Sequence, residues 1–440
     1  MSGFSRTVIP MLSAGDVLTL TIDKPAAGGR MIARADRLVV FVSGAIPGER
    51  VRAKIERVGK DVAYAAAVDI EEPSGDRRTA GGDPLCGGCL YAHIAYPRQL
   101  ELKALVIADA FTRIGRIELP AAVHVAPSPE EGYRMRARLH VRGRLIGFFR
   151  EGTHEVCDAR QTRQLLPATS DALDRLLAAA HSLALDGIRE VELAENLDAS
   201  QRVVYLDVAT VPDGSAARSL ERLAATDGLT GLAAPGAVHG DVYVTDTITI
   251  EGRPPIALRR HVLAFFQGNR YLVNQLAAHV VSQVTPGGEV IDVYAGVGVF
   301  AMTAAAICGA RVTAVEGNRI AAADLAANAA ATNGAVVAVH QSVEEFLSGA
   351  VRSVGLKPDR DQPAPMLIVD PPRTGISREA IDGICRLEAP RIVYVSCDVA
   401  TLARDARRIL NSGYALAQVD GFDLFPNTPH VETVAVFNRT

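Results

Sequence analysis

RIVYVSCDVATLARD, residues 391–405, sets the fold class of the last third of the chain. Its run of β-branched and aromatic residues up to Val395 is typical of a fully buried strand, and the polar Asp398 begins a helix-like segment. Cys397 therefore stands at the carboxyl end of a buried parallel strand, where open α/β sheets keep their chemistry. For an isolated cysteine, an inert buried thiol is the simpler interpretation. The choice depends on what else reaches this edge.

A second strand–turn–helix unit lies upstream, in GGEVIDVYAGVGVFAMTAAA (287–306). Gly296 and Gly298 allow the backbone to turn sharply and to approach a ligand closely. Twenty residues beyond Gly296, the strand-like RVTAVE ends in Glu316, which is placed to bind the two ribose hydroxyls of an adenosine. The pattern is weak alone, because NAD-dependent enzymes share it and Ala301 fits their permissive third position.

Two more segments add carboxylates. In MLIVDPPRTGIS (366–377) a buried strand runs into Asp370 and two prolines, which force the chain out of the sheet and present the carboxylate to a cleft. We therefore expect strand ends to converge on one rim of one sheet, at Asp292, Glu316, Asp370 and Cys397. In FPNTPHVETVAV (425–436), Glu432 begins the last strand. A lone glutamate there is more often a surface residue, but beside a thiol it is a candidate general base.

The composition indicates a globular protein of two or three domains. The chain has 440 residues, which is too long for one ordinary core. Of these residues 48% are hydrophobic and 22% are charged, which is the composition of a folded globular protein and not of a disordered chain. No apolar run approaches the roughly 18–20 residues of a membrane span, and the N-terminus lacks the features of a signal peptide. We expect a cytoplasmic protein without a membrane partner. The net charge of −4 argues mildly against a nucleic-acid partner, except through local patches.

The N-terminal segment from about residue 16 to residue 70 carries five short β-like runs separated by turn signals. This spacing predicts a small all-β barrel. Such barrels often bind RNA, but a purely structural role fits the bare pattern equally well. Residues 71–84 are expected to form a linker or loop by their Gly, Pro and charge content.

An arginine-rich segment follows, YRMRARLHVRGRLIGFFR (133–150). Arg134, Arg136 and Arg138 alternate, so in a strand they share one face, and guanidinium groups suit phosphate contacts. A solvated strand face is the usual explanation, and the density of arginine favours RNA only slightly. Residues 166–262 alternate helix-like and strand-like segments and predict an α/β middle domain.

Six cysteines in so long a chain do not make a disulfide framework, so metal-binding or catalytic roles are favoured. Cys86 and Cys89 form a C-x₂-C pair, and Cys157 is the nearby candidate for a third ligand. A closed four-cysteine zinc site is excluded by the ligand count. An iron–sulfur cluster held by three cysteines and another ligand, or simply idle thiols, are both consistent with the pattern.

Taken together, FFQGN, DVYAGVGVF, VDPPRTG, VYVSCDVATLARD and FPNTPHVE resemble the S-adenosylmethionine-dependent RNA uracil-C5 methyltransferases. The barrel resembles the TRAM domain of the branch that acts on 23S ribosomal RNA, and CGGC and YRMRAR match that branch. The resemblance implies a Rossmann-like class I methyltransferase sheet in residues 263–440, an RNA-binding TRAM/OB-like barrel in 1–75 and an α/β RNA-binding middle domain in 76–262. DVYAGVGVF alone would indicate only a class I methyltransferase, whereas VSC with HVE indicates uracil C5.

The resemblance also implies roles for individual residues. Cys397 matches the nucleophile that adds to uracil C6, and Glu432 matches the base that removes the C5 proton. Phe265 matches a residue that stacks on the target uracil, and Asp370 one that hydrogen-bonds it. The positions that match the binding site of S-adenosylmethionine are Gln267, Asp292, Tyr294, Gly296, Gly298, Glu316 and Asp370. The target uracil must leave its stack to reach such a pocket.

One departure concerns the cysteines. Family members with an iron–sulfur cluster carry a further cysteine six residues before CGGC, where this chain has Ala80. Cys86, Cys89 and Cys157 remain, and Asp83 is the nearest oxygen ligand. We expect a labile or missing cluster.

The leading hypothesis is a monomeric enzyme that methylates uridine in 23S rRNA. The same reaction on the T-loop uridine of tRNA is the alternative, disfavoured by the barrel. An NAD-dependent oxidoreductase gives no task to Cys397 or Glu432, and a non-catalytic RNA-binding protein would not need to keep them.

Overall fold

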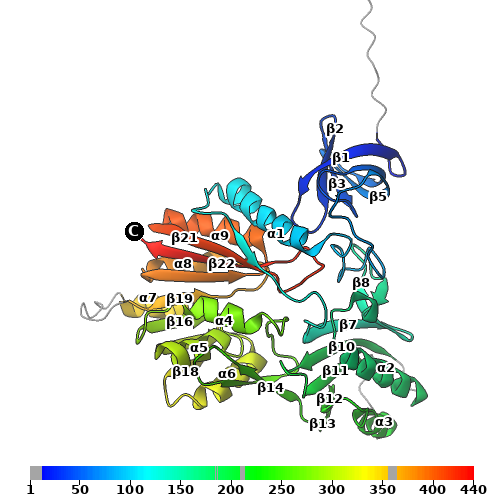
Figure 1. Cartoon of the computed structure of the whole chain (residues 1–440). Helices are drawn as coiled ribbons and strands as arrows, with labels where there is room; N and C mark the ends of the chain where they lie inside the picture. Colours follow the sequence, from blue (N-terminus) through cyan, green and yellow to red (C-terminus); the bar gives the residue numbers. More distant parts are fainter. Residues whose placement is uncertain (1–11, 184, 186, 209–213, 355–363) are drawn as a thin grey trace, which may run out of the picture.

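The computed structural model describes residues 12–183, 185, 187–208, 214–354 and 364–440, which form three main sheets (Figure 1). The first eleven residues, on which the expected lack of a signal peptide rests, lie outside the described residues. In the part of the chain that is described, no helix has the length and apolar character needed to cross a membrane.

The N-terminal strands close into the predicted barrel, in the order β1-β2-β3-β5-β4. Alternate residues of β4 are buried and exposed, as a strand with one face on a barrel core requires. The five strands are β1 (Val17–Pro25), β2 (Met31–Ala35), β3 (Leu38–Ser43), β4 (Arg50–Val58) and β5 (Val62–Glu72).

The middle region forms a seven-stranded sheet in the order β13-β12-β11-β10-β7-β8-β9. Leucines of α2 (Pro167–Ser182) and α3 (Gly214–Ala224) share one core with β7, β10 and β11, so both helices cover the sheet. The strands are β7 (Arg136–Arg142), β8 (Leu145–Phe149), β9 (Val156–Asp158), β10 (Ile188–Glu195), β11 (Arg202–Val208), β12 (Gly231–Ala234) and β13 (Ala237–Gly240).

The last sheet has eight strands in the order β18-β17-β16-β19-β20-β22-β21-β6. Its first five strands in this order are parallel, and β22 runs against β20. The strands from the C-terminal part are β16 (Glu289–Val293), β17 (Arg311–Glu316), β18 (Val336–His340), β19 (Met366–Val369), β20 (Arg391–Ser396), β21 (Tyr414–Phe422) and β22 (Glu432–Arg439). This is the predicted doubly wound class I methyltransferase sheet.

Helices cover both faces of that sheet. One core contains residues of α4 (Val273–Val281), α5 (Val299–Cys308) and α6 (Arg319–Ala330). The opposite core contains residues of α7 (Val343–Val354), α8 (Arg378–Arg386), α9 (Val399–Asn411) and α1 (Tyr96–Ala110). With apolar residues buried on both sides, the parallel strands lack polar–apolar alternation, which is why they appear in the sequence as continuous apolar runs.

The sheets cut across the predicted boundary between residues 76–262 and 263–440. β6 (His124–Ala126) pairs in parallel with β21, and α1 packs into the core of the last sheet. The ribbon of β14 (Tyr243–Ile248) and β15 (Ile256–His261) contributes side chains to the core that contains α4, α5 and α6. Local patterns cannot show which distant strand a short segment joins, so the linear division missed these exchanges.

α1 continues directly into a π-helical turn, η1 (Phe111–Gly115).

Candidate active site

The predicted rim exists in the structure. β16, β17, β19 and β20 are parallel neighbours, so their carboxyl ends meet at one edge of the sheet. Glu316 is the last residue of β17, Asp370 follows β19 and Cys397 follows β20, while Asp292 lies one residue before the end of β16. Figure 1 labels two of these neighbours, β16 and β19.

The glycine turn contacts the acid at the end of β17. The backbone N–H of Gly296 donates to Oε2 of Glu316 at 2.8 Å, and the N–H of Asn318 donates to Oε1 at 2.6 Å. A Cβ at Gly296 would meet no atom within 4 Å, so the turn faces open space at this point. The turn and the acid therefore border the same space, as nucleoside binding requires.

Backbone conformation explains the second glycine. Gly298 has φ +97°, and a Cβ there would lie 2.8 Å from Leu325 and 2.9 Å from Met302, so a larger residue would clash. Tyr294 also has a positive φ, 61°, which is uncommon for a residue with a side chain and occurs mostly where the surroundings enforce it. Burial raises the pKa of its hydroxyl above the usual value, so it remains protonated.

Asp292 is fully buried, and neither of its carboxyl oxygens has a hydrogen-bond partner of ordinary geometry among the described residues. Burial, and then the charge of Asp370, raises the pKa of Asp292 well above its usual value, with the Ala301 amide acting in the opposite sense. A buried polar group without a partner is costly. The site therefore suits a ligand that brings hydrogen-bond donors or positive charge, and S-adenosylmethionine carries both an ammonium and a sulfonium.

Gln267 and Asp370 contact each other, with Nε2 of Gln267 donating to Oδ2 of Asp370 at 3.2 Å. Burial raises the pKa of Asp370 to about 7, although the hydrogen bond from Gln267 favours the ionised form. Phe265 is 58% exposed, and the guanidinium carbon of Arg136 lies 5.7 Å from the centroid of its ring. An exposed ring held by a cation is available for stacking on a base.

The thiol and the candidate base lie close enough to influence each other. Burial, and then the charge of Glu432, raises the pKa of Cys397 to about 12. Glu432 is 3% exposed, and burial followed by the charge of Asp370 raises its pKa well above the usual value. Arg373 opposes both shifts, through its charge in each case and through a hydrogen bond to Cys397. A thiol, a carboxyl group and a guanidinium group thus influence one another electrostatically.

Sequence reasoning assigned no role to Arg373. Its signal was present, because it directly follows the two prolines of the 366–377 segment whose Asp370 was predicted to face the cleft. A basic residue three positions after that acid was a candidate for the same cleft.

The segment that leads to Glu432 is held by residues far away in the sequence. Lys103 of α1 is 1% exposed, pairs with Asp423 and donates to the carbonyl of Phe425 at 3.1 Å. Gln99 of α1 donates to Oδ1 of Asn427 at 2.9 Å and accepts from the N–H of Asn427 at 2.9 Å. The segment that precedes Glu432 is therefore held by α1.

The alternating arginines share one side of β7, but their guanidinium groups already have partners. Arg138 donates to Glu192 at 2.6 Å, and Arg136 lies 3.6 Å from the same carboxylate. Arg134, which precedes the strand, donates to Gln164 at 2.7 Å and stacks near the ring of Phe425. Much of their charge is therefore neutralised within the protein, and a role of these arginines in phosphate contacts stays a prediction.

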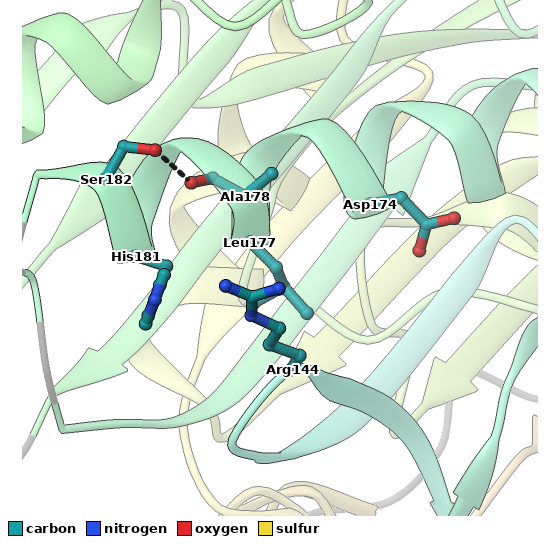
Figure 2. Close-up of a pocket in the computed structure, with 6 residues that line it drawn as sticks. All are labelled: Arg144, Asp174, Leu177, Ala178, His181 and Ser182. Carbon is teal, nitrogen blue, oxygen red and sulfur yellow. Dashed lines mark hydrogen bonds between the residues drawn. The ribbon is translucent and has the colours of Figure 1, made fainter.

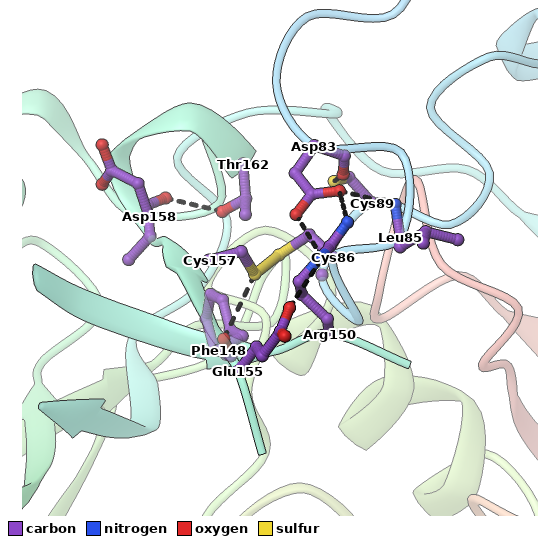
Figure 3. The surroundings of a disulfide bond; sticks show 12 residues. Asp83, Leu85, Cys86, Cys89, Phe148, Arg150, Glu155, Cys157, Asp158 and Thr162 are labelled. Atoms are coloured by element: carbon purple, nitrogen blue, oxygen red, sulfur yellow. Dashed lines mark hydrogen bonds and ion pairs between the residues drawn. A yellow bond between two sulfur atoms is a disulfide. The ribbon is translucent and has the colours of Figure 1, made fainter. Parts of the chain in front are cut away.

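The three cysteines lie together, as Figure 3 shows, but the structure does not support them as a metal site. Cys86 and Cys157 form a disulfide, and disulfide sulfurs are not the thiolates that metals bind. Cys89 donates to the carbonyl of Asp83, whose carboxylate pairs with Arg150 at 2.7 Å. Among the described residues, no group of three or more His, Cys, Asp or Glu could hold a metal ion. These residues do not fit an iron–sulfur cluster, and we derive no step through one.

A cavity of about 290 Å³ opens beside α2 (Figure 2), where its lining includes Arg144, Asp174 and His181. Asp174 already pairs with Arg160 at 2.7 Å. None of the rim residues lines this cavity, so it adds nothing to the site.

Comparisons with known proteins agree with this geometry. Residues 237–440 match the tRNA (Uracil-5-)-methyltransferase family, and residues 13–68 match the TRAM domain. An uncharacterized RNA methyltransferase of Thermosynechococcus vestitus is 30% identical over 97% of this chain and 99% of its own. The 23S rRNA (uracil(1939)-C(5))-methyltransferase RlmD of Methylococcus capsulatus is 33% identical over 95% of this chain and 96% of its own.

A solved structure shares the fold. The tRNA (uracil-54, C5)-methyltransferase of Pyrococcus abyssi, in complex with S-adenosyl-L-homocysteine, superposes with a TM-score of 0.72 at 22% identity, covering 95% of this chain and 99% of its own. The NAD-dependent oxidoreductase and the non-catalytic binding protein are not supported by these findings. The chain belongs to the TRAM-domain family of S-adenosylmethionine-dependent RNA (uracil-C5)-methyltransferases.

Proposed function

We propose that the chain methylates C5 of a uridine in 23S rRNA through a covalent intermediate on Cys397. The observation that carries this proposal is the meeting of Cys397, Glu432 and Asp370 at the rim that also holds the glycine turn. A thiol and a carboxyl group beside a nucleoside-binding turn are the groups that this reaction needs.

Uracil C5 is a weak nucleophile, so the ring must first be activated. The Cys397 thiolate forms a bond to C6, and the electrons of the C5–C6 double bond move onto the O4 side of the ring. C5 then takes a methyl group from S-adenosylmethionine, which supplies it as an electrophile on a positively charged sulfur. Glu432 removes the C5 proton, and cleavage of the bond between sulfur and C6 restores the double bond and the thiolate.

The protonation states define what each residue must do. The pKa of Cys397 is raised even though Arg373 opposes the shift, so its thiolate is scarce near neutral pH in the free protein. Glu432 must lose a proton before it can act as a base, and Arg373 favours its ionised form too. Asp292 and Asp370 would hold S-adenosylmethionine, and the positive charge of the bound cofactor would lower the pKa of nearby carboxyl groups and so favour the ionised form of Glu432.

Substrate binding is proposed to use both ends of the molecule. Phe265 offers an exposed ring for the flipped uracil, and Asp370 accepts a hydrogen bond from its N3–H. The barrel would hold RNA around the target through shape and backbone contacts.

The choice of 23S rRNA rests on the relatives. Besides the Methylococcus enzyme, RlmD of Halomonas elongata is 32% identical over 96% of this chain, and its name gives the same reaction. The barrel does not decide against tRNA, because the Pyrococcus tRNA enzyme matches 95% of the chain, which includes most of the barrel. The tRNA uridine therefore remains the second candidate.

The test uses purified protein, S-adenosylmethionine labelled in its methyl group, and separate pools of unmodified 23S rRNA and tRNA. We expect label in 23S rRNA that maps to 5-methyluridine. Label confined to tRNA would overturn the substrate assignment and keep the reaction, whereas label in neither pool would overturn the proposed function.

A further inference from the structure

Asp405 lies on α9, two turns after the nucleophile, and is fully buried. Its Oδ2 accepts from the backbone N–H of Ile376 at 3.0 Å and from the hydroxyl of Tyr394 at 3.0 Å. Its Oδ1 accepts from Nε of Arg404 at 2.8 Å. A buried carboxylate is costly unless it is paired and hydrogen-bonded, and this one has three partners.

α9 holds the loop between β19 and α8 (residues 370–377) at two further points. Nη2 of Arg404 donates to the carbonyl of Thr374 at 3.2 Å, and Oγ1 of Thr401 shares its hydrogen between the carbonyl of Asp398 at 3.0 Å and that of Arg373 at 3.4 Å. The bond to Ile376 makes a third contact within four residues of loop. Every contact is to the loop backbone, so α9 fixes the path of the chain that carries Arg373.

The loop approaches α9 so closely that one position excludes side chains. Gly375 has φ +78°, and a Cβ there would lie 2.5 Å from Nη2 of Arg404 and 2.7 Å from Oδ2 of Asp405. Gly375 therefore allows the loop backbone to lie close to the Asp405 carboxylate, where a larger residue would clash.

α9 also fixes the thiol. Cys397 precedes the helix, and Asp398 caps it by accepting from the N–H of Thr401 at 2.8 Å. One rigid element therefore positions both Cys397 and the loop of Arg373. We propose that Asp405 is a positioning residue for methyl transfer, which holds the Arg373 loop so that the guanidinium stays beside the Cys397 thiol. This inference rests on the proposed role of Cys397.

A positioning role of Asp405 differs from a purely stabilising one because its effect on Cys397 depends on Arg373. If Asp405 acts through Arg373, then Asp405→Asn and Arg373→Ala should weaken the same interaction, and the double variant should lose little more than Arg373→Ala alone. A merely structural acid would give additive losses.

The experiment measures the rate at which iodoacetamide alkylates Cys397 in the free protein between pH 7 and pH 10. The extent of alkylation is measured by mass spectrometry of the peptide that contains Cys397. The peptide readout is needed because Cys89, Cys308 and Cys385 are also free thiols. We expect Asp405→Asn to raise the pKa of Cys397, to lower the alkylation rate about three- to tenfold and to shift its pH profile to higher pH. Each unit of increase in the pKa lowers the thiolate fraction tenfold, but the thiolate that remains is more nucleophilic, so the rate falls by less than tenfold per unit.

The matched control is Glu49→Gln in the barrel. Glu49 is also fully buried, accepts from the backbone N–H groups of Ile46 and Ser74, and pairs with Arg77 at 2.6 Å. This variant should leave alkylation of Cys397 unchanged. If Asp405→Asn does not fold, Thr401→Val removes one bond to the loop and should give a smaller loss in the same direction.

Unchanged alkylation in Asp405→Asn, or losses that add to those of Arg373→Ala, would overturn the positioning role. Neither result bears on whether Cys397 is the nucleophile. That question is answered separately by Cys397→Ala, which must abolish methyl transfer to RNA if the proposed function holds.

Discussion

The proposed nucleophile and the proposed base are held by different parts of the chain. Cys397 depends on α9 and on the loop after β19, which all lie between residues 370 and 411. Glu432 follows a segment that is held from α1, more than 300 residues earlier in the sequence. Damage on the α1 side should therefore change mainly proton removal, whereas displacement of Arg373 should affect both groups, because its charge acts on Cys397 and on Glu432.

The contact on the base side is as specific as that on the thiol side. Gln99 is fully buried and also donates to the carbonyls of Tyr91 and Ile94, at 3.1 and 3.0 Å. Asn427, its partner, has φ +63°, a conformation that asparagine tolerates better than most residues. The N-terminal half thus contributes to positioning for the last step of the reaction, beyond any contact with RNA.

The largest effect should come from Glu432→Gln. The amide cannot take the C5 proton, so the methylated ring should stay attached to Cys397, with a loss of turnover of about 10²- to 10⁴-fold. A denaturing gel with labelled RNA should show a stable protein–RNA species, and Cys397→Ala should abolish it. Free RNA alone on that gel, in spite of bound S-adenosylmethionine, would contradict Glu432 as the base.

An intermediate effect is expected from Gln99→Leu, which removes both bonds to Asn427. We expect turnover to fall about tenfold because a general base is sensitive to small displacements. The covalent species should accumulate, while iodoacetamide should alkylate Cys397 at the normal rate. Asp405→Asn should differ from it by slow alkylation of Cys397.

The control for Gln99→Leu is Asn196→Leu. Asn196 is a buried amide that donates to the carbonyl of Thr245 and accepts from the N–H of Gln201, in the turn between β10 and β11. Asn196→Leu should lower the free energy of unfolding by a similar amount, but the covalent protein–RNA species should not accumulate. Slow alkylation of Cys397 in Gln99→Leu would show that the two sides are not independent.

These differences explain what could be predicted from the sequence. Cys397, Asp370 and Glu316 lie at the ends of strands whose apolar runs are visible locally, and parallel strands bring their ends to one edge. Asp405 and Gln99 were not predicted, because each acts through backbone groups that only the folded chain brings near. Phe265 and Tyr294 were assigned by resemblance alone, Glu432 also from its place at the start of the last strand, and the roles of all three remain predictions.

The cysteines show the opposite limit. Spacing correctly placed Cys86, Cys89 and Cys157 together, but a ligand set also requires that every sulfur be free to act as a thiolate. The pairing of Cys86 with Cys157 depends on β9 lying against the C-x₂-C loop, which no local pattern records. The short β6 was missed for the same reason.

The smallest effect on methyl transfer should follow from removing that disulfide. It closes a loop between residues 71 apart, and the chain-entropy description gives about 4 kcal/mol of stabilisation for such a loop. We expect the double variant Cys86→Ser, Cys157→Ser to unfold at a lower temperature, with alkylation of Cys397 unchanged.

The base side should respond slightly, because the N–H of Tyr91, just beyond the cysteine loop, donates to the carbonyl of Asn427 at 2.8 Å. A loosened loop would therefore slow release of the RNA by no more than about threefold, since the bonds from Gln99 and Lys103 remain. Iron content and visible absorption should be the same for both proteins. Iron bound to the parent protein and lost from the variant would show that these sulfurs serve as ligands, and the disulfide would then be the wrong state of the pair.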